Sequence, residues 1–250
     1  MNLNEIKKYL KTDIIGNNLI CLDETDSTNN DCKRNCDAED GTVFAAELQT
    51  AGRGRRGHNW LSPKGSGLWF SILLKPSIPP ERISQITLVA GLAICRVIGG
   101  KIKYPNDIVI GTKKVCGILT ELICGNSVVC GIGINVNNDS FEDEISNRAT
   151  SLKIENGIEY NREKLLAEIL NEFEILYCEF AKNGLCMIID EYKSKCVTWK
   201  SEVAVSYENR SVTGVCSDIT ADGNIVVDTV NGRIIINSGE VSVRGIYGYV

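Results

Sequence analysis

The chain has 250 residues, enough for one medium-sized domain with a small appendage and for a core that could frame a closed substrate site. Its formal net charge of -5 and its pI near 5.1 oppose the long-range attraction that drives nonspecific binding of nucleic acid. We therefore expect no DNA among its partners.

The cysteine content and the hydropathy of the chain indicate in which cellular compartment the protein works. Eleven cysteines are scattered along the chain without the C-x-x-C spacing of a zinc site, and we expect no signal peptide. No apolar run approaches the ~20 residues that a membrane-spanning helix needs. We expect reduced thiols, a cytoplasmic protein and no membrane contact.

Apolar periodicity in the first half of the chain predicts mixed helices and strands. A short amphipathic helix is expected within the first twenty residues, which are too few for a DNA-binding domain. Two strands and a longer helix follow, and the helix lies between Pro79-Pro80 and Gly99-Gly100. The ranges of these three elements are residues 43–47, 68–74 and 81–98.

The second half predicts a hairpin, a long helix and a small β-rich region. Residues 115–123 and 128–136 read as antiparallel strands that turn at Gly125-Asn126. A long helix with one apolar face runs from a cap at Asn161 to Gly184. Four short β runs then predict a second domain, so we divide the chain into residues 1–197 and 198–250. The four runs are residues 203–207, 211–215, 225–230 and 233–237.

A loop of glycines and arginines, residues 52–57, formally satisfies the G-x-G-x-x-G pattern of dinucleotide-binding folds. We reject that interpretation because the loop continues into His58 and Asn59 without opening a helix, whose N-terminus would have to face the pyrophosphate. Arg53, Arg55 and Arg56 repel one another, so an anion such as polyphosphate or carboxylate is their natural partner. A solvated basic turn remains an alternative. An arginine-glycine RNA-binding segment is a weaker one, because such RNA-binding segments usually repeat and this one occurs once.

Six motifs in one order resemble the biotin protein ligases and together span nearly the whole chain. The resemblance implies an α+β fold of the class II aminoacyl-tRNA synthetase/biotin ligase type, a mixed sheet with helices on one face, plus a C-terminal SH3-like β-barrel. The chain starts close to the ligase core, so it resembles the members that lack an N-terminal DNA-binding domain. The motifs are Ser27-Thr28-Asn29, residues 49–60, Lys103-Tyr104-Pro105-Asn106-Asp107, residues 114–121, residues 131–137 and residues 239–244.

The resemblance implies a reaction in two steps. The carboxylate of biotin attacks the α-phosphate of ATP, and a lysine of a biotin carboxyl carrier protein then attacks the resulting biotinyl-5'-AMP. Two anions must meet in the first step, so cationic side chains and Mg²⁺ have to offset their repulsion. The implied substrates are ATP and biotin, Mg²⁺ is the implied cofactor with no ligands assigned, and a homodimer is a further expectation.

Residue roles carried over from the family fall into three groups. Neutral donors and acceptors suit the polar edge of the biotin rings, an aromatic face suits adenine, and cations suit the reacting anions. The expected biotin-binding residues are Ser27, Thr28, Asn29, Gln49, Gly52, Arg53, Arg55, Lys114, Gly117 and Gly133. The expected ATP-binding residues are Arg53, Arg56, Trp60, Asn106, Lys114 and Asn135. The expected catalytic residues are Lys114, Arg55, Arg53 and Asp107.

Each of these roles has a plainer alternative. Lys114 could be a turn lysine, Ser27 a helix cap, and Trp60 an ordinary core residue. Glu240 and Arg244 match C-terminal family positions, but charged residues at the end of a small barrel are commonly solvated. The glycines in the strands would mark close approach of a ligand or of another part of the chain.

The sequence departs from the family at His58, where an arginine is common, and at Tyr104, where a tryptophan is usual. A buried Tyr104 hydroxyl would need a hydrogen-bond partner. One competing function is lipoate or octanoate transfer, but the full arginine loop and the β-rich tail favour biotin. The other is a biotin-sensing or carrier-binding protein without turnover, but Lys114 and the loop arginines together favour an enzyme.

Overall fold

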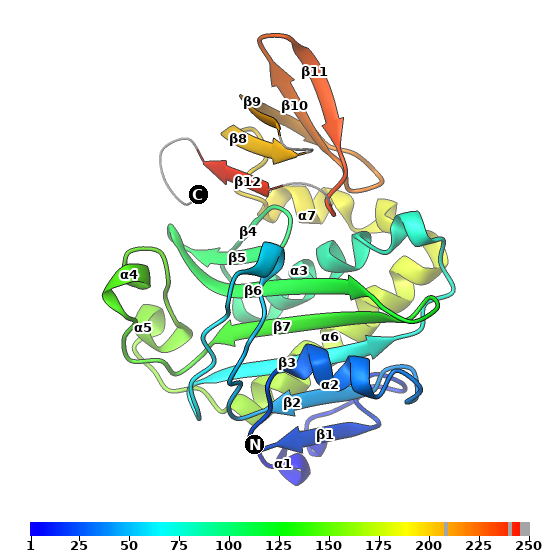
Figure 1. The fold of residues 1–250 in the computed structure, drawn as a ribbon, viewed down its shortest axis with the longest axis vertical. Coiled ribbons are helices and arrows are strands. Elements are labelled where there is room, and N and C mark those ends of the chain that lie inside the picture. Colours follow the sequence, from blue (N-terminus) through cyan, green and yellow to red (C-terminus); the bar gives the residue numbers. More distant parts are fainter. Residues whose placement is uncertain (208–209, 240–241, 246–250) are drawn as a thin grey trace.

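A computed structural model describes residues 1–207, 210–239 and 242–245. Its larger part is a seven-stranded mixed sheet in the order β1-β2-β3-β7-β6-β5-β4 (Figure 1). β1 and β2 are parallel, and the other neighbours are antiparallel. The strands are β1 (Leu19–Leu22), β2 (Val43–Ala46), β3 (Gly67–Leu74), β4 (Lys101–Lys103), β5 (Asp107–Ile110), β6 (Lys113–Leu122) and β7 (Val128–Asn135).

Helices cover both faces of this sheet, unevenly. The two longest helices, α3 and α6, pack against each other behind the sheet in the view of Figure 1. The described helices are α1 (Leu3–Lys7), α2 (Thr28–Arg34), α3 (Gln85–Ile98), α4 (Asp143–Ser146), α5 (Leu152–Asn156), α6 (Arg162–Asn183) and α7 (Ile189–Lys195), with 3-10 turns at η1 (Arg55–Gly57), η2 (Pro80–Arg82) and η3 (Leu185–Met187).

The expectation that helices lie on one face is wrong for α2, which lies in front of β2, β3 and β7 (Figure 1). Alternation along β3 explains how both faces are used, because neighbouring side chains of a strand point to opposite faces. Ile72 belongs to the large core that includes α3 and α6. Leu73 instead packs in a separate small cluster with Cys32 of α2 and Val129 of β7.

A five-stranded antiparallel sheet in the order β11-β10-β9-β8-β12 lies beyond the β4 edge of the large sheet (Figure 1). This arrangement fits the expected SH3-like domain, and β9 is longer than the predicted run 211–215. The strands are β8 (Glu202–Tyr207), β9 (Arg210–Ile219), β10 (Ile225–Thr229), β11 (Gly232–Ile236) and β12 (Ser242–Gly245).

Most of the predicted elements are confirmed, and their ends have local causes. The side chain of Asn161 accepts a hydrogen bond from the Lys164 amide at the start of α6, and the helix ends at Gly184. The β6–β7 hairpin turns at the predicted place. The helix predicted from residue 81 starts later, at Gln85, because the residues after Pro79-Pro80 form the short η2 turn. No helix in the described part of the chain is long and apolar enough to cross a membrane.

Candidate active site

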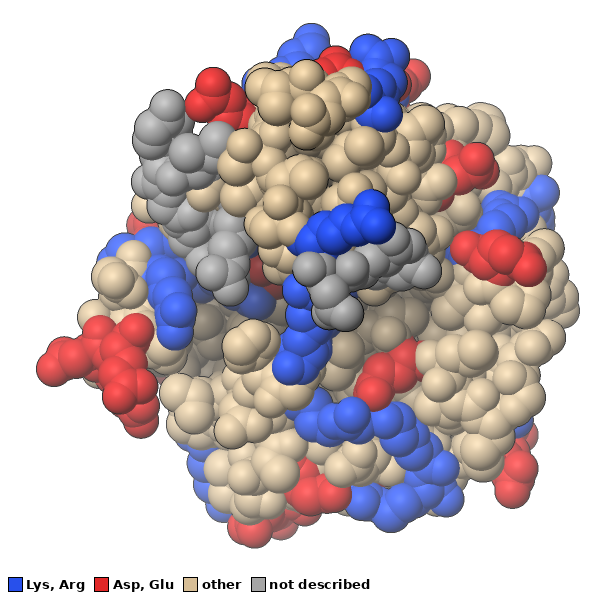
Figure 2. All heavy atoms as spheres, turned by 45° about the horizontal axis from the view of Figure 1, so that its top comes forward, with Lys and Arg blue, Asp and Glu red and all other residues tan. Residues whose placement is uncertain are grey.

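A cavity of about 940 Å³ opens where the large sheet, the arginine loop and the small sheet meet. Its volume lies in the range of small-molecule sites. Figure 2 shows lysine and arginine side chains on several sides of a recess in this region. Eight of the expected site residues line this cavity, namely Gln49, Arg55, Arg56, Trp60, Asn106, Asp107, Lys114 and Asn135.

A second, smaller cavity of about 40 Å³ adjoins the first. The two cavities share Trp60 and Lys114 in their walls. The smaller one adds the expected biotin-binding residues Ser27, Thr28, Asn29, Arg53, Gly117 and Gly133. The structure thus brings together residues that lie more than a hundred positions apart in the sequence.

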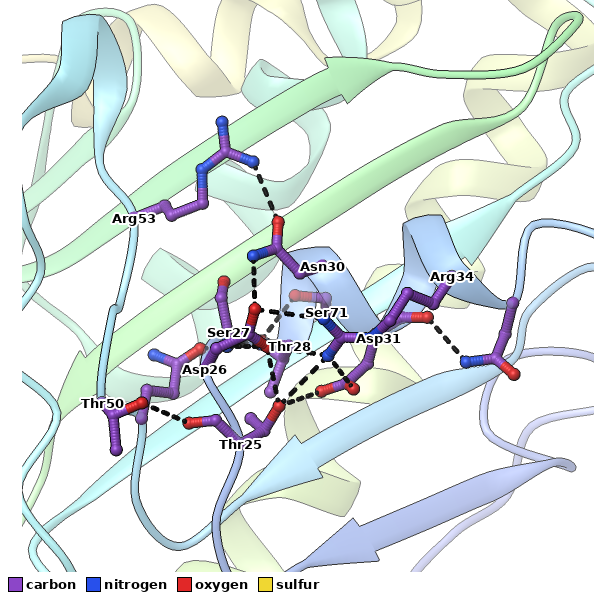
Figure 3. A network of polar contacts seen from close by, with 12 residues as sticks. Thr25, Asp26, Ser27, Thr28, Asn30, Asp31, Arg34, Thr50, Arg53 and Ser71 are labelled. Atoms are coloured by element: carbon purple, nitrogen blue, oxygen red, sulfur yellow. Dashed lines mark hydrogen bonds and ion pairs between the residues drawn. The ribbon is translucent and has the colours of Figure 1, made fainter.

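A polar network surrounds the start of α2 (Figure 3). The Oε1 atom of Gln49 accepts hydrogen bonds from the Thr28 amide at 2.9 Å and from the Thr28 hydroxyl at 3.1 Å. The Thr28 and Ser71 hydroxyls lie 2.7 Å apart. Ser27 occupies the expected N-cap position of α2, but its side chain makes no capping hydrogen bond within the described chain.

Asn29 extends this network to β6. Its Oδ1 atom accepts a hydrogen bond from Ser71 at 2.7 Å, and its Nδ2 atom donates to Glu121 at 2.8 Å. A Cβ atom on Gly131 would lie only 1.9 Å from Asn29 Oδ1, so the missing side chain is what admits Asn29. Glu121 was not assigned a role by the sequence analysis, although a carboxylate that follows the mainly apolar run of residues 115–119 in the same strand was a usable signal.

Trp60 lies against a floor of two glycines. A Cβ atom on Gly133 would lie 2.4 Å from the indole Nε1 of Trp60, and one on Gly117 would lie 2.9 Å from its Cζ3. The ring of Trp60 meets Trp69 edge-on at 6.4 Å between centroids. Within the described chain, its buried Nε1 atom has no hydrogen-bond acceptor. A buried indole N–H usually has a hydrogen-bond partner, so this one is available to donate to a ligand.

Two lysines in the cavity wall, Lys114 and Lys103, both face the carboxylate of Asp107. Its Oδ1 atom lies 2.6 Å from the Nζ atom of Lys114, and its Oδ2 atom lies 3.9 Å from Nζ of Lys103. The Lys114 ammonium also lies 5.0 Å from the centroid of the Trp60 ring, within the range of a cation–π contact. Lys114 is therefore no solvated turn lysine, because it projects into the cavity wall beside both groups.

The loop of residues 49–62 folds back on itself, and its three arginines diverge. The backbone pairs across the loop through hydrogen bonds from Trp60 to Gly52 at 2.9 Å and from Gly54 to His58 at 2.7 Å. Gly52 contributes to the loop itself, because a Cβ there would lie 2.3 Å from the Trp60 carbonyl oxygen. His58 is exposed at the tip.

Each arginine contacts a different element. Arg53 pairs with Glu121 at 3.1 Å and donates to Asn30 at 3.2 Å (Figure 3 shows the contact with Asn30). Arg55 donates to Asn106 Oδ1 at 3.2 Å and to the carbonyls of Ser238 and Gly239 at 3.2 and 3.0 Å. The remaining arginine, Arg56, donates to the Ser206 carbonyl of β8 at 3.2 Å.

The surroundings of Arg55 also change the pKa of its side chain. Burial, and then the charge of Arg56, lower the pKa of the Arg55 guanidinium.

The expected hydrogen-bond partner of the Tyr104 hydroxyl exists, because this buried side chain donates to the Gly223 carbonyl at 2.9 Å. Glu240 lies outside the described residues, as does the side chain of Arg244.

Two family models match this chain. One is described as the biotin/lipoate A/B protein ligase family and matches residues 19–138, and the other is described as the biotin protein ligase C terminal domain and matches residues 201–244. The first match covers the arginine loop and most of the residues that line the large cavity. The fold and the site therefore define a ligase of the biotin/lipoate class.

Individual relatives specify the class further. The chain is 35% identical to the bifunctional ligase/repressor BirA of Bacillus spizizenii, across 95% of this chain and 78% of that one. It is 28% identical to the biotin--[acetyl-CoA-carboxylase] ligase of Mycobacterium tuberculosis, across 81% and 79% of the two chains. The biotin protein ligase from Aquifex aeolicus, solved in complex with biotin and ATP, aligns with a TM-score of 0.84 and 34% identity over 92% of this chain and 99% of that chain. The chain belongs to the biotin protein ligase family and is a ligase, as the motifs predicted.

Proposed function

We propose that this enzyme joins biotin to ATP, forming biotinyl-5'-AMP, and then transfers biotin to a lysine of a biotin carboxyl carrier domain. The observation that carries the proposal is the position of Lys114. Its ammonium lies in the wall shared by the large cationic cavity and the small polar cavity. A cation at that junction is suited to hold a carboxylate from one side and an α-phosphate from the other. The Aquifex relative was solved with biotin and ATP, which supports the same pair of substrates here.

The small cavity is the proposed site of the biotin rings. Thr28, Gln49 and Asn29 present fixed donors and acceptors there. Its about 40 Å³ is only a few times the ~10–15 Å³ that one water molecule requires, so a bicyclic ligand needs more room. Trp60 lies over Gly117 and Gly133 at its edge, and we propose that this side chain shifts when biotin enters. The shift would also bring its unpaired Nε1 and its ring face toward the nucleotide.

The large cavity is the proposed nucleotide site. Asn106 and Asn135 line it and are proposed to read the polar edge of adenine. Both amides are already oriented by the backbone, since Asn106 donates to the Ile118 carbonyl at 3.1 Å and Asn135 to the Thr150 carbonyl at 3.0 Å. Arg53, Arg55 and Arg56 are proposed to neutralise phosphate, and Arg55 also to retain the adenylate.

The donor set does not form a dedicated magnesium site. Among the described residues no group of three His, Cys, Asp or Glu side chains could hold an ion. Asp107 lines the cavity, but its two carboxylate oxygens face Lys114 and Lys103. Mg²⁺ usually keeps several waters and binds through substrate phosphates. We therefore propose that Mg²⁺ arrives with ATP, where it offsets phosphate charge, and we assign it no protein ligand.

Domain organisation and partner follow from the same proposal. The first family match ends at residue 138 and the second begins at residue 201, which supports two domains with a boundary between these residues. We keep the proposed division into a catalytic domain of residues 1–197 and a small C-terminal domain of residues 198–250. The Mycobacterium relative is named for acetyl-CoA carboxylase, which supports a carboxyl carrier domain as the partner.

Exchange of labelled pyrophosphate into ATP tests the first step without any carrier. Biotin, lipoate and octanoate are compared in wild type, Lys114→Met and the matched control Lys113→Met, whose lysine instead donates to the Ser146 carbonyl. We expect biotin-dependent exchange that falls roughly 10²-fold in Lys114→Met and stays near wild type in Lys113→Met. Exchange with lipoate or octanoate alone would assign the sister activity. The absence of exchange in folded protein that still binds biotin would favour a sensor.

A further inference from the structure

Lys103 is a buried lysine to which the proposed reaction gives no role so far. It is 6% exposed, and Asp107 is 8% exposed. The two residues are partners in the antiparallel register of β4 and β5, on either side of a short turn. Removing an ammonium group from water is unfavourable unless charged or polar partners compensate. A buried cation in the wall of a substrate cavity is therefore a candidate for a functional charge.

Asp107 is shared between two lysines at unequal distances. Lys114 contacts one carboxylate oxygen at 2.6 Å, and Lys103 lies 3.9 Å from the other. All three side chains line the large cavity. In the proposed first step the Lys114 ammonium turns toward the biotin carboxylate and the α-phosphate. Asp107 then loses its nearer cation at the moment when the site becomes more anionic.

We propose that Lys103 is a positioning residue that keeps the Asp107 carboxylate ionised and aimed into the cavity after Lys114 has turned to the activated acid. The inference rests on the proposed function and assigns Lys103 to its second step. Asp107 then accepts a hydrogen bond from the incoming lysine amine. The amine, after losing one proton to solvent, attacks the acyl carbon. A C–N bond forms, the C–O bond to AMP breaks with its electron pair, and the second nitrogen proton passes to solvent.

A purely structural role for Lys103 makes a different prediction. If the Lys103–Asp107 contact only fastened β4 to β5, its loss would weaken the fold and slow both steps alike. A positioning role affects the second step more, because Lys114 serves the first step directly. A misplacement of about 1 Å at a reacting group can slow a step roughly 10²-fold.

The test compares Lys103→Met, which preserves length without charge, with Lys103→Arg, which restores the charge. Lys101→Met is the matched control, since Lys101 is exposed on the same strand. Step one is pyrophosphate exchange with biotin. Step two is single-turnover transfer from preformed biotinyl-5'-AMP to the purified apo carrier domain of an acetyl-CoA carboxylase. Thermal unfolding is measured for every variant.

For Lys103→Met we expect transfer at saturating carrier to slow roughly 10-fold or more, while exchange falls by about 3-fold at most. Lys103→Arg should recover most of the transfer rate, and Lys101→Met should match wild type. As pH is lowered, the transfer rate should begin to fall at a higher pH in Lys103→Met than in wild type. The reason is that a carboxyl group that loses a neighbouring cation protonates more readily. Asp107 also faces Lys114 and interacts with Arg55 and Cys116, so each variant is titrated over the full range.

Equal losses in both steps, or a pH profile that does not move, would overturn the inference. Wild-type transfer rates in a folded Lys103→Met protein would overturn it as well. These outcomes leave the proposed function intact as long as wild type exchanges pyrophosphate with biotin and labels the carrier. Failure of wild type in exchange would instead refute the proposed function itself.

Discussion

The close approach of Asn29 to Gly131 gives a sharp prediction for Gly131→Ala. The new methyl group would lie 1.9 Å from Asn29 Oδ1 and 2.7 Å from its Cγ, far inside van der Waals contact. Asn29 is 5% exposed and held by Ser71 and Glu121, so it has little freedom to yield. The substitution must therefore displace Asn29 or distort β7.

The magnitude follows from the two consequences of the clash. Overpacking of a buried site lowers the free energy of unfolding by about 1–3 kcal/mol, which for a chain of this size is roughly 2–12 °C in Tm. A displaced Asn29 also loses its proposed hydrogen bond with biotin. That loss is worth about 0.5–1.5 kcal/mol, or roughly 2- to 12-fold in the dissociation constant of biotin.

Calorimetric titration with biotin and thermal unfolding measure these two effects. Gly91→Ala is the matched control, because Gly91 lies inside α3 and a Cβ there would meet only Ile118 at an ordinary 3.8 Å. We expect Gly91→Ala to leave biotin affinity unchanged and to raise stability by about 0.5–1 kcal/mol, since alanine is the better helix former.

A double-mutant cycle decides whether Asn29 is the cause. In an Asn29→Ala background the Gly131 methyl group finds room, so Gly131→Ala should cost at least about 1 kcal/mol less in unfolding free energy than in wild type. Strictly additive effects would refute the reasoning, as would full stability and affinity in Gly131→Ala alone.

Two further predictions concern buried polar side chains, Glu121 and Tyr104. Burial alone would raise the pKa of Glu121, but hydrogen bonds from Asn29 and Lys33 outweigh it and hold the pKa below the ordinary 4.5. The stabilisation is therefore present above about pH 4.5 and is lost as pH falls through the folded-state pKa, so the stability difference between wild type and Glu121→Gln should shrink on acidification in urea unfolding series. Tyr104→Phe removes the donor to the Gly223 carbonyl and should lower the free energy of unfolding by about 1–3 kcal/mol, whereas an unchanged midpoint would show that water replaces the hydroxyl.

Periodicity predicted the elements whose patterns are long and regular. The stripe of α6 and the alternation of β6 and β7 each span enough residues to separate a period of 3.6 from one of 2. Among the elements of 3 to 7 residues, β2 was predicted but β1, β4, β5, β12 and α7 went unrecognised, because so few residues carry little periodicity. Such short elements are defined mainly by the neighbours they pair with, as β4 is by β5.

The site residues were predicted by motif, but their mutual contacts were not. Nothing in the spacing shows that Arg53 meets Glu121 or that Arg55 reaches Ser238, because both contacts depend on the tertiary fold. Glycine was the most informative residue type, since a glycine inside a strand indicates close approach. The partner that approaches Gly131, the Asn29 side chain, could be identified only from the structure.

The location of the site follows from how the two faces of the sheet are used. The long helices α3 and α6 cover one face and build the main core, and no described residue of either helix lines the two cavities. On the other face Gly117 and Gly133 replace side chains with backbone, which leaves room for a flat ring near the sheet. The loop arginines are anchored to the C-terminal region by Arg55, which donates to the Ser238 and Gly239 carbonyls between β11 and β12, and by Arg56, which donates to the Ser206 carbonyl of β8. Displacement of the small sheet should therefore alter phosphate neutralisation before it alters the polar network around Thr28, which the large sheet holds independently.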